Sequence, residues 1–151
     1  MEKRYRDLQR EVHPDRFSTA PVSEQRQSME MATRVNEAYR TLKTPLLRVR
    51  YMLELEGGDV LAETNTAMPR EFLMQQMGWR EVLEEAAEAR NAQRLDALDA
   101  QVGAELDATF ADVEVALDAR DGATSASLVR KLMFLDKLRE EIGAAQERLE
   151  N

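Results

Sequence analysis

The stretch Leu8-Gln9-Arg10-Glu11-Val12-His13-Pro14-Asp15-Arg16-Phe17 decides how the first part of this chain folds. A basic segment with helical periodicity precedes Pro14, which disfavours αR geometry in the residue before it and has no backbone N–H to donate. We therefore expect His13, the only histidine of the chain, to lie beside Asp15 in a tight, exposed loop between two helices. A lone histidine placed next to an aspartate in such a loop suggests a functional role.

The segments on either side of this loop predict a helical hairpin. Residues 2–12 place Tyr5, Leu8 and Val12 on one face of a helix, at spacings of three and four. The second helix is expected over residues 24–43, with Ser23 as its N-cap. Its buried stripe is predicted to contain Met29, Ala32, Val35 or Asn36, Tyr39 and Leu42.

The composition favours an all-α protein without a bound metal or other cofactor. Only four prolines and six glycines interrupt a chain that is 43% hydrophobic and 33% charged, and strong helix formers are abundant. Because there is no cysteine and one histidine, disulfides are excluded and a zinc site is not expected. No apolar run approaches the roughly 20 residues of a membrane span, and no signal peptide is visible, so a cytoplasmic protein with no membrane contact is expected.

The charge is distributed unevenly between two parts of the chain. Residues 1–50 carry eleven basic and seven acidic side chains, a net charge of +4. Because the whole chain carries −8, the remaining residues carry −12. This asymmetry suggests two units with different partners. Lys3, Arg6 and Arg10 share one face of the first helix, although such a stripe is more often a solvated surface than a binding site. Nucleic acid is not an expected partner, because the basic part is small and lacks an aromatic stacking platform.

The acidic remainder predicts an antiparallel three-helix bundle. A short connecting helix is expected over residues 46–55, ended by Gly57-Gly58, and long helices over 69–91, 93–119 and 124–149. The apolar stripes of the last two helices are Leu95, Leu98, Val102, Leu106, Phe110, Val113 and Leu117, and Leu128, Leu132, Leu135, Leu138, Ile142 and Leu149. The predicted organisation is an N-terminal unit over 1–55, a linker over 56–68 and the bundle over 69–151.

The first bundle helix carries apolar residues on two faces. Phe72, Trp79, Leu83 and Ala86 form its core stripe, and a broad face centred roughly opposite contains Leu73, Met74, Met77, Glu81 and Glu85. Methionine is common on adaptable binding surfaces, so this second face is a candidate interaction site. The pattern supports equally well a face that packs on the connecting helix or the first unit. Phe134 lies a quarter-turn from the core stripe of its helix, where it either borders this face or is a boundary core residue.

Together, these features resemble the J-domain of DnaJ-type co-chaperones. The resemblance rests on the basic helix, the His13-Pro14-Asp15 tripeptide, and the later run Val35-Asn36-Glu37-Ala38-Tyr39-Arg40-Thr41-Leu42. A J-domain normally opens with a further short helix, and this chain starts inside the basic helix. Either the native start lies upstream or the J-domain is truncated at its start, and without the opening helix we expect apolar surface exposed at Tyr5, Leu8 and Tyr39.

The rest of the chain is similar to the HscB family of J-domain co-chaperones, which act in bacterial iron–sulfur cluster assembly. The similar stretches are Pro45–Gly57 and Val129–Leu138. The resemblance implies that the protein stimulates the ATPase of a DnaK/HscA-class heat-shock chaperone through His13, Pro14, Asp15, Lys3, Arg6, Arg10 and Arg16. It also implies that the bundle binds the scaffold protein IscU through Leu73, Met74, Met77, Glu81, Glu85 and Phe134. Gly78 departs from the family, which often has an acidic residue there.

Two other functions remain open at this stage. The protein can be a helical interaction module that binds the scaffold while its truncated J-segment no longer engages an ATPase. An enzyme that uses His13 and Asp15 as an acid–base pair is a weaker alternative, because the sequence identifies neither a third catalytic group nor an oxyanion site. The prediction is therefore a co-chaperone adaptor that is not an enzyme.

Overall fold

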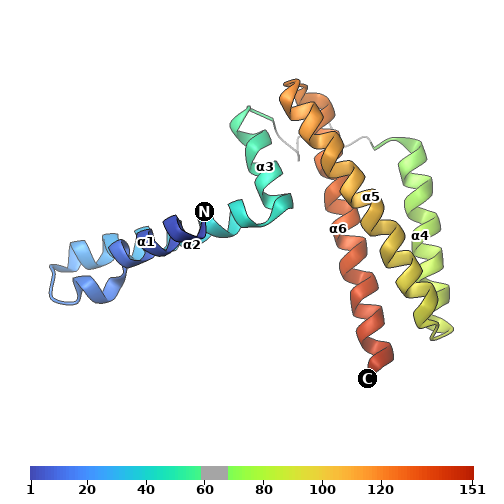
Figure 1. Ribbon diagram of the computed structural model, residues 1–151, viewed down its shortest axis with the longest axis horizontal. Helices are drawn as coiled ribbons and strands as arrows, with labels where there is room; N and C mark the ends of the chain where they lie inside the picture. Colours follow the sequence, from blue (N-terminus) through green and yellow to red (C-terminus); the bar gives the residue numbers. More distant parts are fainter. Residues whose placement is uncertain (59–67) are drawn as a thin grey trace. The chain divides into compact units, whose positions relative to one another are not determined.

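The structure, a computed structural model, describes residues 1–58 and 68–151, and within these residues it contains helices and no strands (Figure 1). This confirms the predicted all-α class. The elements are α1 (Glu2–Val12), the one-turn 3₁₀ helix η1 (Pro14–Phe17), α2 (Val22–Lys43), α3 (Pro45–Leu55), α4 (Arg70–Glu88), α5 (Ala92–Asp118) and α6 (Gly122–Glu150).

The contacts divide the chain into two compact units, Met1–Tyr51 and Met52–Asn151. The division falls inside α3, close to the end of the N-terminal unit that the sequence suggests. Of the linker predicted over 56–68, residues 59–67 lie outside the described part of the chain. Each unit is described by itself below.

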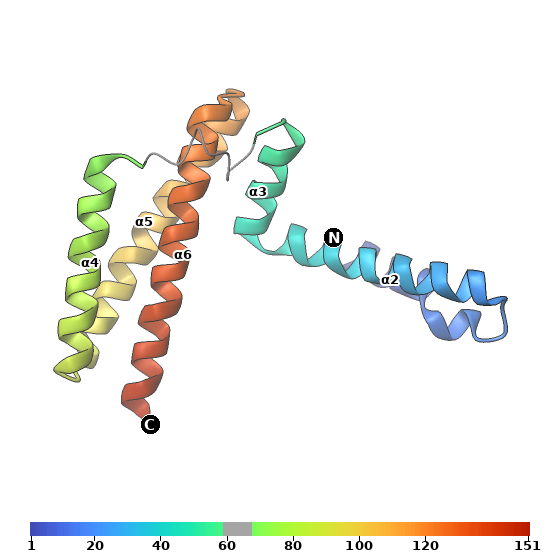
Figure 2. The ribbon, with the colours of Figure 1, turned by 180° about the vertical axis from the view of Figure 1, so that it is seen from behind.

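The first unit is a hairpin in which α1 runs antiparallel to α2 (Figure 2). Tyr5 and Tyr39 stack with ring centroids 3.8 Å apart, and the Tyr5 hydroxyl donates a hydrogen bond to Asn36 Oδ1 at 2.8 Å. The Gln9 amide donates to the Tyr5 hydroxyl at 2.7 Å and so joins the same network. Aromatic stacking and polar bonds therefore hold the two helices together, in a unit that buries little apolar surface.

The predicted buried stripe of α2 is wrong at Met29 and Leu42, which are 61% and 37% exposed, and its residues Ala32, Val35 and Tyr39 are only half-buried. Beside Met29, Ser28 is buried instead. The Ser28 hydroxyl donates to the carbonyl of Val12, at the end of α1, over 2.7 Å. That carbonyl belongs to the last turn of a helix, where no intrahelical donor is available to it. Satisfying it turns Ser28 toward α1 and the next residue, about 100° around the helix, toward solvent.

The connecting helix α3 ends as the glycine pair predicts, although its buried residue is none of Leu47, Tyr51 and Leu55, the apolar residues that recur at four-residue spacing in its sequence. Gly57 has a positive φ of 81°, and the Gly58 N–H donates to the Leu53 carbonyl at 3.0 Å, which is the pattern of a Schellman C-cap. Leu53 is fully buried, while Leu55 is exposed. The four-residue spacing of apolar residues in this short helix did not identify Leu53.

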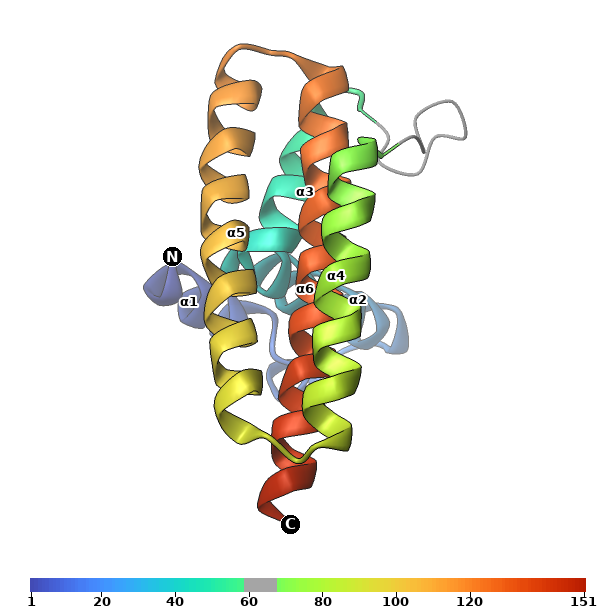
Figure 3. The same ribbon diagram turned by 90° about the vertical axis from the view of Figure 1, so that its right-hand side faces the viewer.

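The second unit is a three-helix bundle in which α4, α5 and α6 run antiparallel (Figure 3). The predicted core residues Phe72, Trp79 and Ala86 of α4 are buried, as are most residues of the two predicted stripes on α5 and α6. Phe110 is half-exposed, and Thr109 is buried in its place. The Thr109 hydroxyl donates to the Glu105 carbonyl at 2.7 Å, so its burial leaves no unsatisfied donor.

Both corners of the bundle are built in the same way. Arg90 and Arg120 have positive φ values of 49° and 53°, and each is followed by a residue whose side chain caps the next helix. At the second corner the cap is Asp121, which accepts from the N–H and the hydroxyl of Thr124, at 3.2 and 2.6 Å. Thr124 acts as a donor to the cap because a carboxylate can accept both of its hydrogen bonds.

We expect Arg120→Gly to stabilise the bundle by about 1 kcal/mol, since a side chain in the left-handed region costs roughly that amount and glycine does not have this cost. The expected rise in the melting temperature is about 2–4 °C, followed by circular dichroism. Ala119→Gly is the matched control, because Ala119 has a right-handed φ of −75° and its replacement should lower stability. A lower melting temperature for Arg120→Gly would contradict the prediction.

The cap at Asp121 should make the bundle sensitive to acid. The hydrogen bonds from the Thr124 hydroxyl and backbone lower the pKa of this carboxyl below its ordinary value. Its contribution to the free energy of unfolding is therefore complete above the unfolded-state pKa of about 3.9 and is lost as the pH falls through the lower folded-state pKa. Asp121→Ala should lower the melting temperature at pH 7, and the gap from the wild type should narrow below about pH 3.9. A gap that is constant with pH would exclude this contribution.

Candidate functional site

The His13-Pro14-Asp15 tripeptide forms a sharp corner between α1 and η1. Helix α1 ends at Val12, His13 is extended with φ −60° and ψ 129°, and Pro14 opens the 3₁₀ turn. The break expected at Pro14 is therefore present. The chain leaves the corner as a short helical turn, which holds Asp15 and Arg16 in defined positions.

The His13 side chain faces the backbone with one nitrogen and solvent with the other. Its Nδ1 accepts a hydrogen bond from the Asp15 N–H at 3.2 Å, and one Asp15 carboxylate oxygen lies 3.6 Å from the same nitrogen. A nitrogen that accepts carries no proton, so the neutral ring is protonated at Nε2. The side chains of His13 and Asp15 are 57% and 93% exposed, which leaves a donor and a carboxylate available to a partner.

Two further side chains support the corner. The Arg16 guanidinium donates to the Arg10 carbonyl at 3.1 Å, and the Gln25 amide donates to the Ala20 carbonyl at 2.9 Å. The first bond satisfies a carbonyl in the last turn of α1, which has no intrahelical donor. The second bond holds the loop between η1 and α2. The corner is thus held in place from α1 and from α2.

A concave basic surface adjoins the corner, with a volume of about 580 Å³. Of the predicted chaperone-binding residues, Arg6, Arg10, His13 and Arg16 line it, together with Gln9, which the sequence analysis did not identify. Gln9 lies three and four residues from Arg6 and His13, so helical spacing alone would have placed it here. Arg6 and Arg10 make long ion pairs of 3.9 and 4.0 Å with acidic neighbours, which neutralise their charges weakly. Lys3 is exposed on α1 and does not line this surface.

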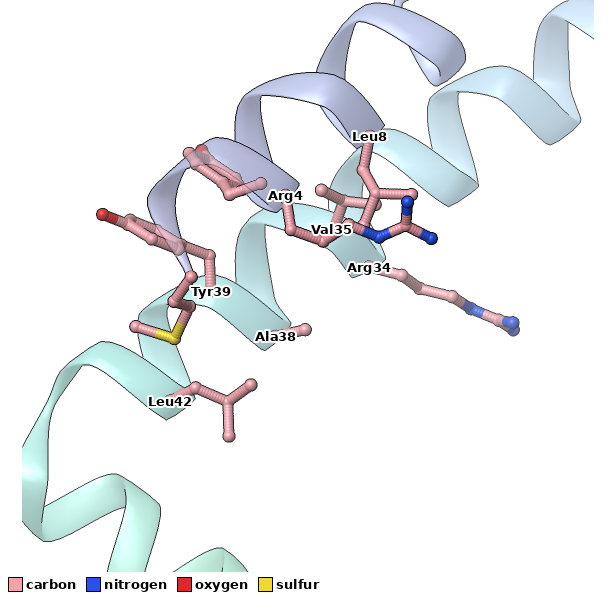
Figure 4. Close-up of a pocket in the computed structure, with 9 residues that line it drawn as sticks. Arg4, Leu8, Arg34, Val35, Ala38, Tyr39 and Leu42 are labelled. Atoms are coloured by element: carbon pink, nitrogen blue, oxygen red, sulfur yellow. The ribbon is translucent and has the colours of Figure 1, made fainter.

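The hairpin also carries an apolar hollow of about 420 Å³ (Figure 4). Tyr5, Leu8 and Tyr39 line it, as expected for the apolar surface of the hairpin, with Arg4 and Arg34 also in its lining. The remaining lining residues are Met1, Val35, Ala38 and Leu42. This unit therefore leaves uncovered part of the apolar surface that its two helices share.

The predicted second face of α4 is exposed along its apolar part. Leu73, Met74 and Met77 are 43%, 62% and 72% exposed, whereas Phe72 and Trp79 on the core stripe are 5% exposed. The helix therefore separates its apolar residues into a buried stripe and an uncovered one. The uncovered stripe does not help to hold the bundle together. Exposed apolar residues grouped in this way are typical of interaction surfaces.

Phe134 of α6 contacts the core stripe of α4. Its ring lies 6.5 Å from that of Phe72, in a tilted arrangement, and Phe134 itself is 42% exposed. It is thus a boundary residue, with one edge against the core and the other uncovered. We call Leu73, Met74, Met77 and Phe134 the apolar face of the bundle.

The two predicted acidic residues farther along α4, Glu81 and Glu85, differ in their interactions. Glu81 is exposed, whereas Glu85 forms a 3.0 Å ion pair with Arg94 of α5. A partner cation would have to compete with Arg94 for Glu85, although an exposed pair of this kind contributes little and exchanges readily. A Cβ atom added at Gly78 would meet nothing within 4 Å, so a side chain at this position would project into open space.

Within residues 1–58 and 68–151, no cluster of three or more metal-ligating side chains is present. In the same part of the chain, no helix combines the length and apolar character needed to cross a membrane.

The bundle matches a known family model, described as the HSCB C-terminal oligomerisation domain, over residues 68–143. Curated relatives match almost the whole chain. A co-chaperone protein HscB homolog from Burkholderia multivorans is 50% identical over 146 residues, which cover 97% of this chain and 83% of the relative. The homolog from Paraburkholderia phymatum is 46% identical over 151 residues, covering 100% of this chain and 86% of the relative.

Two solved structures are also similar. The chaperone HscB from Vibrio cholerae has a TM-score of 0.85 at 33% identity, with 98% of this chain and 87% of that chain covered. The crystal structure of the human co-chaperone protein HscB has a TM-score of 0.87 at 31% identity, with 95% and 71% covered. Sequence and fold therefore agree on the same relatives.

Proposed function

The chain belongs to the HscB family of co-chaperones, and on this premise we propose that it serves iron–sulfur cluster assembly by joining two proteins. One is a heat-shock ATPase of the DnaK/HscA class, whose ATP hydrolysis the protein stimulates. The other is the scaffold protein IscU, which the protein delivers to the chaperone. It catalyses no reaction of its own, and it acts in the cytoplasm.

The chaperone binds the basic surface beside the His13-Pro14-Asp15 corner. Arg6, Arg10 and Arg16, together with the more distant Lys3, attract an acidic region of the ATPase and orient the encounter. Once docked, the exposed Asp15 carboxylate pairs with an arginine of the partner, and the outward Nε2–H of His13 donates to a partner acceptor. Pro14 sets the backbone direction that presents both groups. The observation that carries the proposal is this corner, exposed yet held rigid by hydrogen bonds from both helices.

The scaffold binds the apolar face of the bundle. Leu73, Met74, Met77 and Phe134 supply the buried centre of the interface, where apolar contacts contribute most of the affinity. Glu81, and Glu85 after exchange of its Arg94 partner, supply acidic contacts at the edge. With one protein bound to each unit, the second association becomes intramolecular, and two weak contacts give a stable ternary complex.

One observation supports the alternative, a scaffold-binding module whose hairpin does not stimulate an ATPase. The hairpin keeps an apolar hollow of about 420 Å³ on its surface, and the only buried side chain of its two helices is that of Ser28. Such a unit has a small reserve of stability, and a rigid corner needs a folded hairpin to support it.

Single-turnover ATP hydrolysis by a purified HscA-class chaperone distinguishes the two functions. The rate is measured with this protein, with IscU, with both and with neither. The proposal expects acceleration by the protein alone and a further increase when IscU is present. Binding of IscU without acceleration selects the interaction module. If the protein neither binds IscU nor accelerates hydrolysis, both functions are wrong.

A further inference from the structure

Two of the eight methionines of the chain lie together at the most exposed part of the apolar face. Met74 and Met77 are one helical turn apart on α4 and are 62% and 72% exposed. Solvent-accessible thioethers are the ones that oxidants reach first. At most protein surfaces this has little consequence, because a more polar side chain there remains in water.

At this position the consequence is different, because the two side chains are placed where a partner must cover them. Leu73 and Phe134, the other residues of the apolar face, are themselves 43% and 42% exposed, and neither side chain has a hydrogen-bond donor. A sulfoxide oxygen buried against these carbon atoms would lose its water and gain no hydrogen bond from them.

We propose that Met74 and Met77 form an oxidation site that controls scaffold binding, an inference that rests on the proposed function of the apolar face. In the reaction with hydrogen peroxide, the thioether sulfur attacks one peroxide oxygen, the O–O bond breaks and an S–O bond forms. After proton transfer the products are methionine sulfoxide and water. The sulfur is oxidised by two electrons, and the peroxide is reduced by the same two.

The modified face binds the scaffold more weakly because the polar, chiral sulfoxide replaces a flexible apolar group. Burial of one unpartnered polar group costs enough to lower affinity by about tenfold or more. The change is reversible, since methionine sulfoxide reductases restore the thioether. Bound scaffold in turn covers the two sulfurs, so the oxidant acts on the protein while it is not in the complex.

The experiment uses the full chain and purified IscU, with hydrogen peroxide as the oxidant. Peptide mass spectrometry follows sulfoxide at every methionine, and calorimetry gives the affinity for IscU before oxidation, after it, and after reductase treatment. We expect sulfoxide at Met74 and Met77 to form ahead of the less exposed Met68 and Met133. Affinity should fall about tenfold or more and return with the reductase. Prior addition of IscU should slow oxidation at Met74 and Met77 only.

Two double variants show which methionines are responsible. Met74→Leu with Met77→Leu removes both sulfurs. The ratio of the affinity of this variant for IscU after peroxide to its affinity before peroxide should stay near one. Met29→Leu with Met31→Leu removes two exposed methionines from α2 and should lose affinity on oxidation as the wild type does. Untreated wild type that fails to bind IscU overturns the proposed function and this inference with it. If the wild type keeps its affinity for IscU after full oxidation of Met74 and Met77, the inference alone is overturned. The same holds if peroxide lowers the affinity of the Met74→Leu, Met77→Leu variant as much as that of the wild type.

Discussion

Replacing His13 by Gln, or Asp15 by Asn, is expected to abolish the stimulation of ATP hydrolysis by an HscA-class chaperone. Asp15→Asn keeps the shape of the side chain and removes the charge that the proposed partner arginine requires. Loss of one charge-assisted hydrogen bond costs about 1.5–3 kcal/mol, which corresponds to roughly a 10- to 100-fold loss in coupling. His13→Gln removes a rigid ring that both accepts the Asp15 N–H and presents an outward donor, so the corner loses its orientation as well as a contact.

The measurement is single-turnover hydrolysis, with IscU affinity determined on the same samples. The matched control is Glu37→Gln, which neutralises an exposed carboxylate of α2 away from the corner. It should leave stimulation unchanged. IscU affinity should be unchanged in all three variants, because the apolar face belongs to the other unit. Stimulation that persists in Asp15→Asn would argue against the ion pair, and a parallel loss of IscU binding would point to general unfolding.

Replacing Leu73 and Met77 together by Ala is expected to weaken IscU binding by about 100-fold or more, because central apolar contacts of an interface cost about 2 kcal/mol or more each when truncated. Both residues are exposed, so the variant should keep the melting temperature of the bundle within a degree or two of the wild type. Stimulation of the chaperone in the absence of IscU should be unaffected. The affinity is measured by calorimetry.

Val115→Ala is the matched control for this pair. Val115 is another exposed apolar residue of the bundle, 69% exposed on α5, and it is not part of the apolar face. Its truncation removes a similar kind of surface and should not change IscU affinity. Equal weakening by Val115→Ala and by the double variant would show that the scaffold does not recognise the apolar face in particular.

Much of the fold could be predicted because helical periodicity is a local property. The bounds of α1, the break at Pro14, and the core stripes of α5 and α6 follow from the spacing of apolar residues and from the backbone chemistry of proline. For Leu73, Met74 and Met77 the pattern left open whether the second face of α4 is packed or exposed, and the structure shows all three residues exposed.

At two positions the prediction failed because two neighbouring residues compete for one place in the core. Periodicity cannot choose between Ser28 and Met29, and the choice fell to Ser28 because a carbonyl at the end of α1 required a donor. The same holds for Thr109 and Phe110, where a threonine that satisfies its own hydroxyl takes the core position.

For the candidate site, the sequence by itself determined which residues are available: a single histidine beside an aspartate, a basic helix, and methionines opposite a core stripe. Only the tertiary structure decided how they are presented. It turned Nδ1 of His13 inward to the Asp15 N–H. It also paired Glu85 with Arg94 of another helix. The physical reason is that the chemistry of a side chain belongs to its residue, whereas its hydrogen-bond partners and exposure depend on which helix packs beside it.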